Sequence, residues 1–281
     1  MRTPHIAVCL KVVPRPEEVK VNLETRTLDR ANARQQFNPP DVNALEFALA
    51  LREKHGGRVS VLSMGPPFFA EYLKLALAVG ADTAYLLSDR AFGGADTLPT
   101  SYTLARGIAK LGDCDLVVCG EESSDGATAQ VPPGIAEWLG MAQVTYGSDL
   151  EILPERWRLK ARRELKGGHE VITVPLPAVV SVRVGANEPR FIDFARLTGE
   201  PLGVTVWSAA DLGVDPAMVG LSGSATVVAG VDRAETVERR RELLTGTPEE
   251  KARTLVERIA VYLGRGTRPD GAAASSPAAH A

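Results

Sequence analysis

Cysteine, histidine and aromatic residues are scarce in this chain. Its 281 residues include three cysteines, Cys9, Cys114 and Cys119, with no Cys-x-x-Cys pair. An odd, unpaired set excludes a disulfide scaffold and suits a reducing cytoplasm. The four histidines have no metal-ligand spacing, so no metal site is predicted. Because aromatic residues make up only 5% of the chain, we expect an aliphatic core.

Excess positive charge and long apolar runs are also missing. The formal net charge is −3 and the isoelectric point is about 5.9, which argues against a nucleic-acid partner. The apolar run between His5 and Lys11 is too short for a secretory signal or a membrane span, and no longer run follows. We therefore predict a cytoplasmic protein without membrane insertion, whose 44% apolar residues suffice for a core.

Strand-like and helix-like stretches alternate over the first 140 residues. The pattern predicts strands at 5–13, 58–64, 83–87 and 116–119, and helices at 39–55, 69–79, 97–111 and 130–139. A small hairpin is expected around 19–28. Such alternation with tight connections predicts an α/β fold, a parallel sheet with helices on both faces.

The pattern changes after about residue 143. Alternation with period two predicts antiparallel strands at 144–153, 156–164, 169–175 and 178–184 that extend the sheet. Residues 186–203 look irregular, 204–207 form a short strand, and 211–223 are rich in turn residues. A charged helix is expected over 234–263, with a cap at residues 247–250. Residues 266–281 have the composition of a disordered tail.

Two loops rich in glycine, threonine and acidic residues follow predicted strands, at residues 87–103 and 119–133. Small and hydroxyl residues beyond parallel strands let the backbone approach an anion, with free N–H groups pointing at it. Neither loop places a nucleophile beside a histidine base. The loops therefore predict a nucleotide-binding site without catalytic residues.

Several further stretches carry a family resemblance when they are taken in order. They read Cys-Leu-Lys-Val-Val-Pro (9–14), Phe-Asn-Pro-Pro-Asp-Val-Asn-Ala-Leu-Glu (37–46), Val-Leu-Ser-Met-Gly-Pro-Pro (61–67), Arg-Glu-Leu-Lys-Gly-Gly-His-Glu-Val (163–171), Asn-Glu-Pro-Arg (187–190) and Gly-Leu-Ser-Gly-Ser (220–224). Together with the two loops, their order and spacing resemble the beta subunit of electron-transferring flavoprotein along residues 5–263.

This resemblance implies a heterodimer with an alpha subunit that carries an FAD in a mobile domain. The FAD shuttles electrons from a flavin dehydrogenase to a quinone reductase or another redox partner. The beta subunit, with an adenine-nucleotide-hydrolase-like sheet, holds a second nucleotide in its own crevice. That nucleotide is AMP in the simple carriers. In the electron-bifurcating branch it is a second FAD, which takes a hydride from NADH.

The resemblance also implies which nucleotide this chain holds. Residues 95–103 and 125–133 are similar to the FAD-binding branch, whereas the AMP-binding branch has an Asn-Gln-Thr-Gly type run where residues 129–132 stand here. Three departures oppose this: Glu121 and Glu122 replace a basic–Gln pair, Ala127 replaces an aspartate, and Pro132 removes an N–H. Carboxylates facing a pyrophosphate would weaken its binding. We predict FAD, with AMP as the alternative, and electron bifurcation stays open.

The family motifs select the candidate ligand contacts. For Asp96 and Thr97 the ordinary alternative is a helix N-cap, and for Asn38 it is a turn residue. The candidate cofactor-binding residues are Cys9, Lys11, Asn38, Ser63, Gly65, Asp96, Thr97, Thr100, Gly120, Asp125, Gly126, Ala127, Thr128, Ala129, Gln130 and Val131.

The domain prediction follows the same resemblance. Residues 1–203 are expected to form the nucleotide-binding domain, residues 204–265 an arm and helix that dock on the alpha subunit, and 266–281 the tail. Residues 191–199 lie where family members present a partner-recognition loop, but lack its usual lysine-rich end.

Two other nucleotide-binding classes share this type of sheet. A hydrolase of the ATP pyrophosphatase type needs a Ser-Gly-Gly-x-Asp-Ser loop after the first strand, where this chain has Lys-Val-Val-Pro-Arg-Pro at 11–16. A stress-type nucleotide-binding module without a redox role wants a glycine-rich run ending in Gly-Ser or Gly-Thr. Residues 119–133 lack that run, and such a module does not need residues 144–263. The sequence therefore favours the electron-transfer subunit.

Overall fold

The computed structural model describes residues 2–22, 27–29, 33–199, 201–228 and 241–262. By its internal contacts the chain divides into two units, Met1–Asp232 and Arg233–Ala281. The first unit contains the sheet and its helices, and the second contains one described helix.

A nine-stranded sheet runs through the first unit in the order β11-β10-β9-β12-β8-β1-β6-β7-β13. Its parallel strands are β1 (His5–Cys9), β6 (Arg58–Met64), β7 (Thr83–Leu87), β8 (Leu116–Gly120), β12 (Ala178–Val182) and β13 (Val204–Trp207). Strand β9 (Ala142–Leu153) joins β12 in parallel and leads antiparallel into β10 (Arg158–Leu165) and β11 (Gly168–Pro175). The predicted fold, a parallel sheet extended by antiparallel strands, is confirmed. The prediction of an antiparallel strand at 178–184 is wrong, because β12 is a central strand, buried throughout, that pairs in parallel with both β8 and β9.

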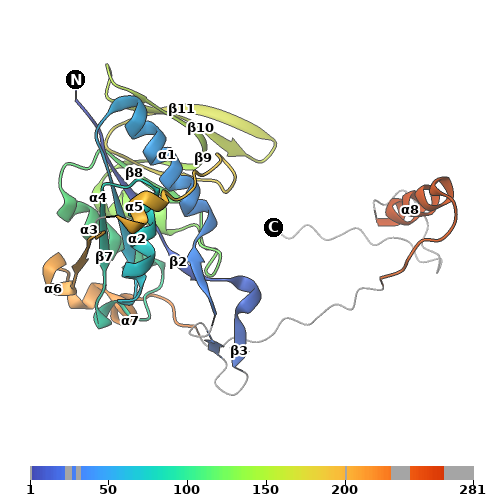
Figure 1. Ribbon diagram of the computed structural model, residues 1–281, viewed down its shortest axis with the longest axis horizontal. Coiled ribbons are helices and arrows are strands. Elements are labelled where there is room, and N and C mark those ends of the chain that lie inside the picture. Colours follow the sequence, from blue (N-terminus) through green and yellow to red (C-terminus); the bar gives the residue numbers. More distant parts are fainter. Residues whose placement is uncertain (1, 23–26, 30–32, 200, 229–240, 263–281) are drawn as a thin grey trace. The chain divides into compact units, whose positions relative to one another are not determined.

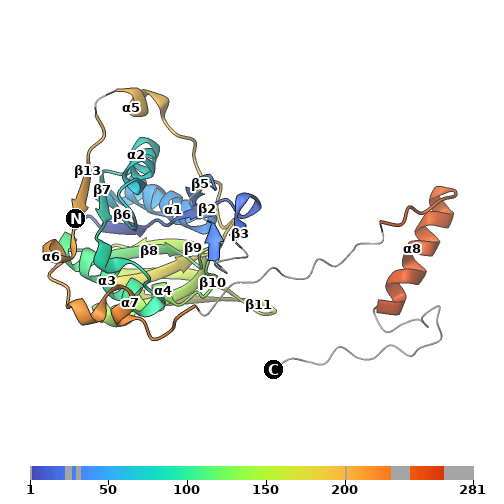
Figure 2. The same cartoon turned by 90° about the horizontal axis from the view of Figure 1, so that it is seen from below.

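Helices cover both faces of this sheet. Figure 2 shows α1 (Pro39–His55) and α2 (Phe69–Val79) on one side, and α3 (Thr97–Leu111) and α4 (Val131–Leu139) on the other. Along β1, Ile6 and Val8 belong to the core beneath α1 and α2, while Ala7 and Cys9 belong to the core beneath α3 and α4. Burial on both faces explains why the parallel strands read as continuous apolar runs.

The strand order reverses between β1 and β8. From β1 the chain continues to β6 and then β7 on one side, and returns to β8 on the other side of β1. In open parallel sheets such a reversal leaves a crevice beyond the carboxyl ends of the strands, where ligands bind. The fold therefore places the candidate site at the ends of β1 and β8.

One predicted strand, at 5–13, is broken in the structure. The main strand β1 ends at Cys9, and β2 (Val12–Pro14) pairs instead with β5 (Gln35–Phe37) in a separate small sheet. Leu10 N donates to Leu62 O at 2.8 Å and Lys11 N to the Asp41 carboxylate at 2.7 Å, so the chain leaves the sheet there. Before β5 lie η1 (Pro16–Glu18) and a hairpin of β3 (Lys20–Asn22) and β4 (Thr27–Asp29).

Residues 186–228 belong to the first unit and pack against its sheet and helices. The stretch expected to be irregular contains α5 (Phe194–Thr198), which contacts α2, and β13 extends the sheet beside β7. Three short helices follow, α6 (Ala209–Leu212), η3 (Pro216–Met218) and α7 (Gly220–Gly223). Both α6 and α7 contact α3, and α7 also contacts η2 (Arg90–Phe92), which follows β7 (Figure 1). The first half of the predicted arm thus lies on its own chain, and docking on an alpha subunit stays a prediction.

The second unit holds α8 (Pro248–Tyr262). Thr247 N donates to Glu250 Oε2 at 2.8 Å and Glu250 N to Thr247 Oγ1 at 3.3 Å, which confirms the predicted cap. The helix begins later than predicted because residues 241–247 are not helical; residues 234–240 and the predicted tail at 266–281 lie outside the described residues. Among the described helices, none combines the length and apolar character needed to cross a bilayer.

Candidate nucleotide-binding site

A cleft of about 810 Å³ lies beyond the carboxyl ends of β1, β6 and β8. Both loops that the sequence singled out contribute to its walls. The predicted residues that line it are Cys9, Lys11, Asn38, Asp96, Thr97, Thr100, Gly120, Asp125, Gly126, Thr128, Ala129, Gln130 and Val131. The fold therefore brings together residues from four separate stretches of sequence.

Three predicted residues, Ser63, Gly65 and Ala127, are not in the lining. Since Leu62 and Met64 face the cleft, strand alternation turns Ser63 toward the opposite face, where it is buried. A Cβ on Gly65 would overlap the Phe69 ring, so this glycine serves local packing. Ala127 N donates to Ser123 O at 2.7 Å and closes a turn.

Residues 128–131 line the cleft at the start of α4. Ala129 has a left-handed φ of +54°, and Gln130, with φ −95°, leads into α4. Such an alternation turns successive N–H groups toward one concavity, a nest for an anion. Within the described part of the chain, no acceptor takes the N–H of residues 128–131. Pro132 and Pro133 contribute no N–H, so these four residues supply the donors at this helix start.

Lys11 and Asn38 hold the second loop against the ends of the strands. Lys11 Nζ pairs with Asp125 Oδ1 at 2.5 Å and donates to Ser123 Oγ at 3.2 Å. Asn38 Nδ2 donates to Glu122 O at 2.8 Å, and its Oδ1 accepts from Ser124 N at 3.0 Å. The polar side chain of Asn38 is thus committed to the loop, although the residue borders the cleft.

The two glutamates that replace the family's basic–Gln pair have different surroundings. Glu121 accepts from Val184 N at 3.1 Å and pairs with Arg183 at 3.4 Å, outside the cleft lining. Glu122 is part of the lining. Only one of the two carboxylates that would oppose a pyrophosphate therefore borders the site.

Asp96 is the N-cap of α3, the role that the sequence offered as the alternative to ligand binding. It also binds Thr226 of the arm. Its Oδ1 accepts from Leu98 N at 2.9 Å, and its Oδ2 accepts from Thr226 N at 2.8 Å and Thr226 Oγ1 at 2.9 Å. Burial pushes the Asp96 pKa upward, but these hydrogen bonds outweigh it and the pKa is lowered. Asp96 thereby fixes one wall of the cleft.

Sequence reasoning missed a second set of lining residues. The apolar residues Leu62 and Met64 lie on the face of β6 that borders the cleft. The alternation of side chains along a strand could have predicted that both face the same side. Thr226 and Val228 come from the arm, and no local pattern pointed to them. The lining residues outside the candidate list are Leu10, Asp41, Leu62, Met64, Gly94, Ala95, Leu104, Cys119, Glu122, Ser123, Pro132, Thr226 and Val228. Of these, Glu122 and Pro132 were noted in the sequence only as departures from the family pattern.

Comparison with known proteins agrees with this geometry. The family model described as "Electron transfer flavoprotein domain" matches residues 25–212. The electron transfer flavoprotein subunit beta of Clostridium acetobutylicum is 43% identical over 256 residues, covering 91% of this chain and 97% of the relative. Subunit CarD of the caffeyl-CoA reductase–Etf complex of Acetobacterium woodii is 41% identical over 260 residues, with the same coverage. Protein FixA of Azorhizobium caulinodans is 42% identical over 231 residues, covering 80% of this chain and 82% of the relative. The chain therefore belongs to the electron transfer flavoprotein family, as a beta subunit.

Proposed function

We propose that this beta subunit holds an FAD in the cleft at the ends of β1 and β8. Together with its alpha subunit it would pass electrons from a flavin dehydrogenase to a quinone reductase or another acceptor. The family binds FAD or AMP, and an alpha subunit is its partner. The observation that carries the proposal is the convergence of both predicted loops on one cleft where the strand order reverses.

The residues around the cleft fit such a nucleotide. The free N–H groups of residues 128–131 suit phosphate oxygens, and the hydroxyl groups of Thr97, Thr100 and Thr128 add polar contacts. Leu62, Met64 and Leu104 give apolar wall for a flat ring system. Ligand pockets span about 300–1,000 Å³, and a cleft of about 810 Å³ has room for a dinucleotide.

A bound FAD would supply the electron-transfer chemistry, and the protein would supply binding, orientation and protection from water. Lys11 and Asn38 hold the phosphate-side loop, and Asp96 holds the arm residues over the cleft. Thr97 Oγ1 donates to Gln130 Oε1 at 3.1 Å and so joins the two loops. We assign no catalytic acid, base or nucleophile to these side chains.

Nucleotide extraction tests this proposal. The heterodimer, co-expressed with its alpha chain and purified, is denatured with acid, and the released nucleotides are separated and counted. We expect two FAD molecules per heterodimer, one from each subunit. One FAD with one AMP would contradict FAD in the cleft. One FAD with no second nucleotide would contradict a nucleotide site in this subunit.

Replacing Thr128 by valine is expected to weaken nucleotide retention about tenfold, because the substitution keeps the shape and removes one hydroxyl contact of about 1–2 kcal/mol. The measurement is the nucleotide content after gel filtration. Thr205→Val, on the exposed part of β13, is the matched control and should change nothing. Equal retention by the two variants would remove the Thr128 hydroxyl from the site.

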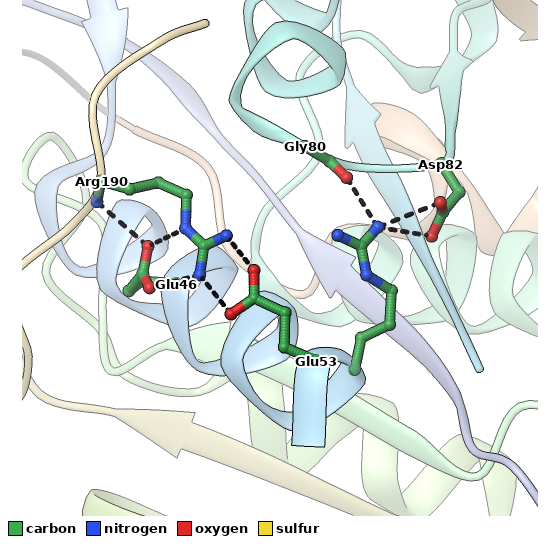
Figure 3. Close-up of polar contacts among 6 residues, drawn as sticks. Glu46, Glu53, Gly80, Asp82 and Arg190 are labelled. Atoms are coloured by element: carbon green, nitrogen blue, oxygen red, sulfur yellow. Dashed lines mark hydrogen bonds and ion pairs between the residues drawn. The ribbon is translucent and has the colours of Figure 1, made fainter. Parts of the chain in front are cut away.

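The surface proposed to meet the electron-transfer partner is residues 186–199. Its side chains Phe191 and Phe194 are 96% and 73% exposed. Figure 3 shows how Arg190 fixes this stretch to α1, donating to Glu46 at 2.8 Å and binding Glu53 as well. Exposed aromatic residues on a firmly held stretch are typical of protein-binding surfaces.

Replacing Arg190 by methionine should loosen residues 188–199, since it removes the ion pairs with Glu46 and Glu53 and leaves Glu46 partly buried without its cation, while the bonds between Asn187 and Asn43 remain. We expect faster amide hydrogen exchange there in the heterodimer. Arg258→Met is the control, because Arg258 likewise makes two bonds to one carboxylate, Glu242, in the second unit. Unchanged exchange at 188–199 would show that Arg190 does not hold this surface.

A further inference from the structure

Asp41 is a buried carboxylate beside the ends of β1 and β8, where the strand order reverses. It has no role in nucleotide binding in the function proposed above. It lies in the first turn of α1, is 6% exposed, and borders the cleft. Its Oδ2 accepts from Lys11 N at 2.7 Å, directly beyond β1. Its Oδ1 accepts from Gly120 N at 3.0 Å, the last residue of β8, and from Asn38 Nδ2 at 3.0 Å. One side chain thus joins two strand ends and the residue that holds the second loop.

We propose that Asp41 is a positioning residue of the nucleotide cleft, and that its ionised carboxylate keeps the ends of β1 and β8 in the arrangement that retains the nucleotide. This inference rests on the proposed function, since it needs a nucleotide in this cleft. Asp41 acts through backbone that borders the cleft, at Lys11 and Gly120, and through Asn38.

The hydrogen bonds require the ionised form. Every group bonded to the carboxylate is a donor: two backbone N–H groups and one amide NH₂. A protonated carboxyl would place its own O–H against one of these donors, and one bond at the strand ends would be lost. An ionised carboxylate satisfies all three at once, so the complete set of bonds at the cleft floor forms only when Asp41 is charged.

The titration of Asp41 falls within the physiological range. Burial raises its pKa to about 7, against the hydrogen bonds from Lys11, Asn38 and Gly120, which lower it. The charged and titratable groups around it are the Lys11 ammonium, paired with Asp125, the Glu122 side chain at the cleft, and the Cys119 thiol on β8. The hydrogen bond with the Cys9 thiol, together with burial, raises the Cys119 pKa, so that thiol stays neutral.

Two properties should therefore respond to pH in opposite directions. A folded-state pKa raised from 3.8 to about 7 means that the contribution of Asp41 to stability falls as pH rises through this window. Nucleotide retention should instead rise over the same window, because the ionised carboxylate holds the cleft. A purely structural role would make retention follow stability, and this difference identifies a positioning role.

Asp115 offers a matched control. It is also a buried aspartate, 4% exposed, that joins β8 to β1, but at the opposite ends of the strands. Its carboxylate accepts from His5 N at 3.0 Å and pairs with Arg2. Asp115→Asn should lower stability without touching the cleft.

The test compares wild-type, Asp41→Asn and Asp115→Asn heterodimers at pH 8 and pH 6, by thermal unfolding and by nucleotide content after gel filtration and acid extraction. Counting FAD and AMP together makes the result independent of which nucleotide binds. We expect wild type and Asp115→Asn to keep the second nucleotide at pH 8 and to lose it severalfold at pH 6. Asp41→Asn should keep about a tenth of it or less at both values.

Retention by Asp41→Asn equal to wild type at both pH values would overturn the proposal. If Asp41→Asn does not fold, the wild-type series decides, because a content that is equal at pH 8 and pH 6, or higher at pH 6, contradicts a requirement for the ionised carboxylate. A wild-type heterodimer with no second nucleotide at either pH would show instead that the proposed function fails, and the inference with it.

Discussion

Replacing Gly120 by alanine is expected to abolish nucleotide retention and to lower the free energy of unfolding by about 3 kcal/mol or more. A Cβ at this position would lie 2.8 Å from Asp41 N and 2.9 Å from Pro40 C, and closer still to the Asp41 carboxylate. The first turn of α1 and the end of β8 would have to separate. That movement breaks the bond from Gly120 N to Asp41 and widens the cleft floor. Urea unfolding and nucleotide extraction measure the two effects.

Gly168→Ala is the matched control for this variant. Gly168 lies in β11, and a Cβ there meets nothing within 4 Å. Its free energy of unfolding should change by about 0.5 kcal/mol or less, with the nucleotide retained. A Gly120→Ala variant that behaved like this control would show that α1 does not approach β8 as closely as the structure describes.

Gly220→Ala should have the second large effect, on the arm that completes the cleft. Gly220 has φ +55°, and its Cβ would lie 2.9 Å from Gly93 O and closer still to Ala91 O. The substitution forces α7 away from the loop after β7, at a cost of about 3 kcal/mol. Ser224 and Thr226, which bind Asp96 just beyond α7, would be displaced with it. We expect lower stability and faster nucleotide dissociation, followed by stopped-flow fluorescence.

Gly140→Ala is the control that separates the two effects of Gly220→Ala, the steric overlap with Ala91 and Gly93 and the strain of a left-handed backbone. Gly140 has a similar φ of +62°, but a Cβ there meets nothing within 4 Å. Its cost should be only about 1 kcal/mol, from the left-handed backbone alone, with unchanged nucleotide dissociation. Equal effects of the two variants would mean that α7 does not press on the loop after β7, and that the arm is not fixed there.

The sequence was sufficient to predict the sheet, its helices and half of the residues that line the cleft. Strand and helix periodicities are local properties, and Cys9, Gly120 and Thr128 follow from motifs at strand ends. The break after Cys9 was not predictable in this way. Apart from His5 and Lys11, residues 5–13 are apolar and read as one strand, and only Asp41, 30 residues after Lys11, draws Lys11 N out of the sheet.

The contributions of distant segments were the hardest to foresee. Asp96 is followed by a helix, so its role as an N-cap was visible, but its bonds to Thr226 depend on the arm returning to α3. Ser63 was expected at the site because its stretch matches a family motif, whereas strand alternation turns it away from the cleft. The sequence suggested that Glu121 would oppose a bound pyrophosphate. In the structure its carboxylate instead binds Arg183 and Val184 N, away from the cleft.

The most direct test of the account is an experimental structure of the heterodimer with its nucleotides bound. The central claim predicts a nucleotide in the cleft between β1 and β8, with phosphate oxygens within hydrogen-bond distance of the N–H groups of residues 128–131. It also predicts Asp41 still bonded to Lys11 N and Gly120 N. An empty cleft, with every nucleotide held by the alpha subunit, would contradict the account.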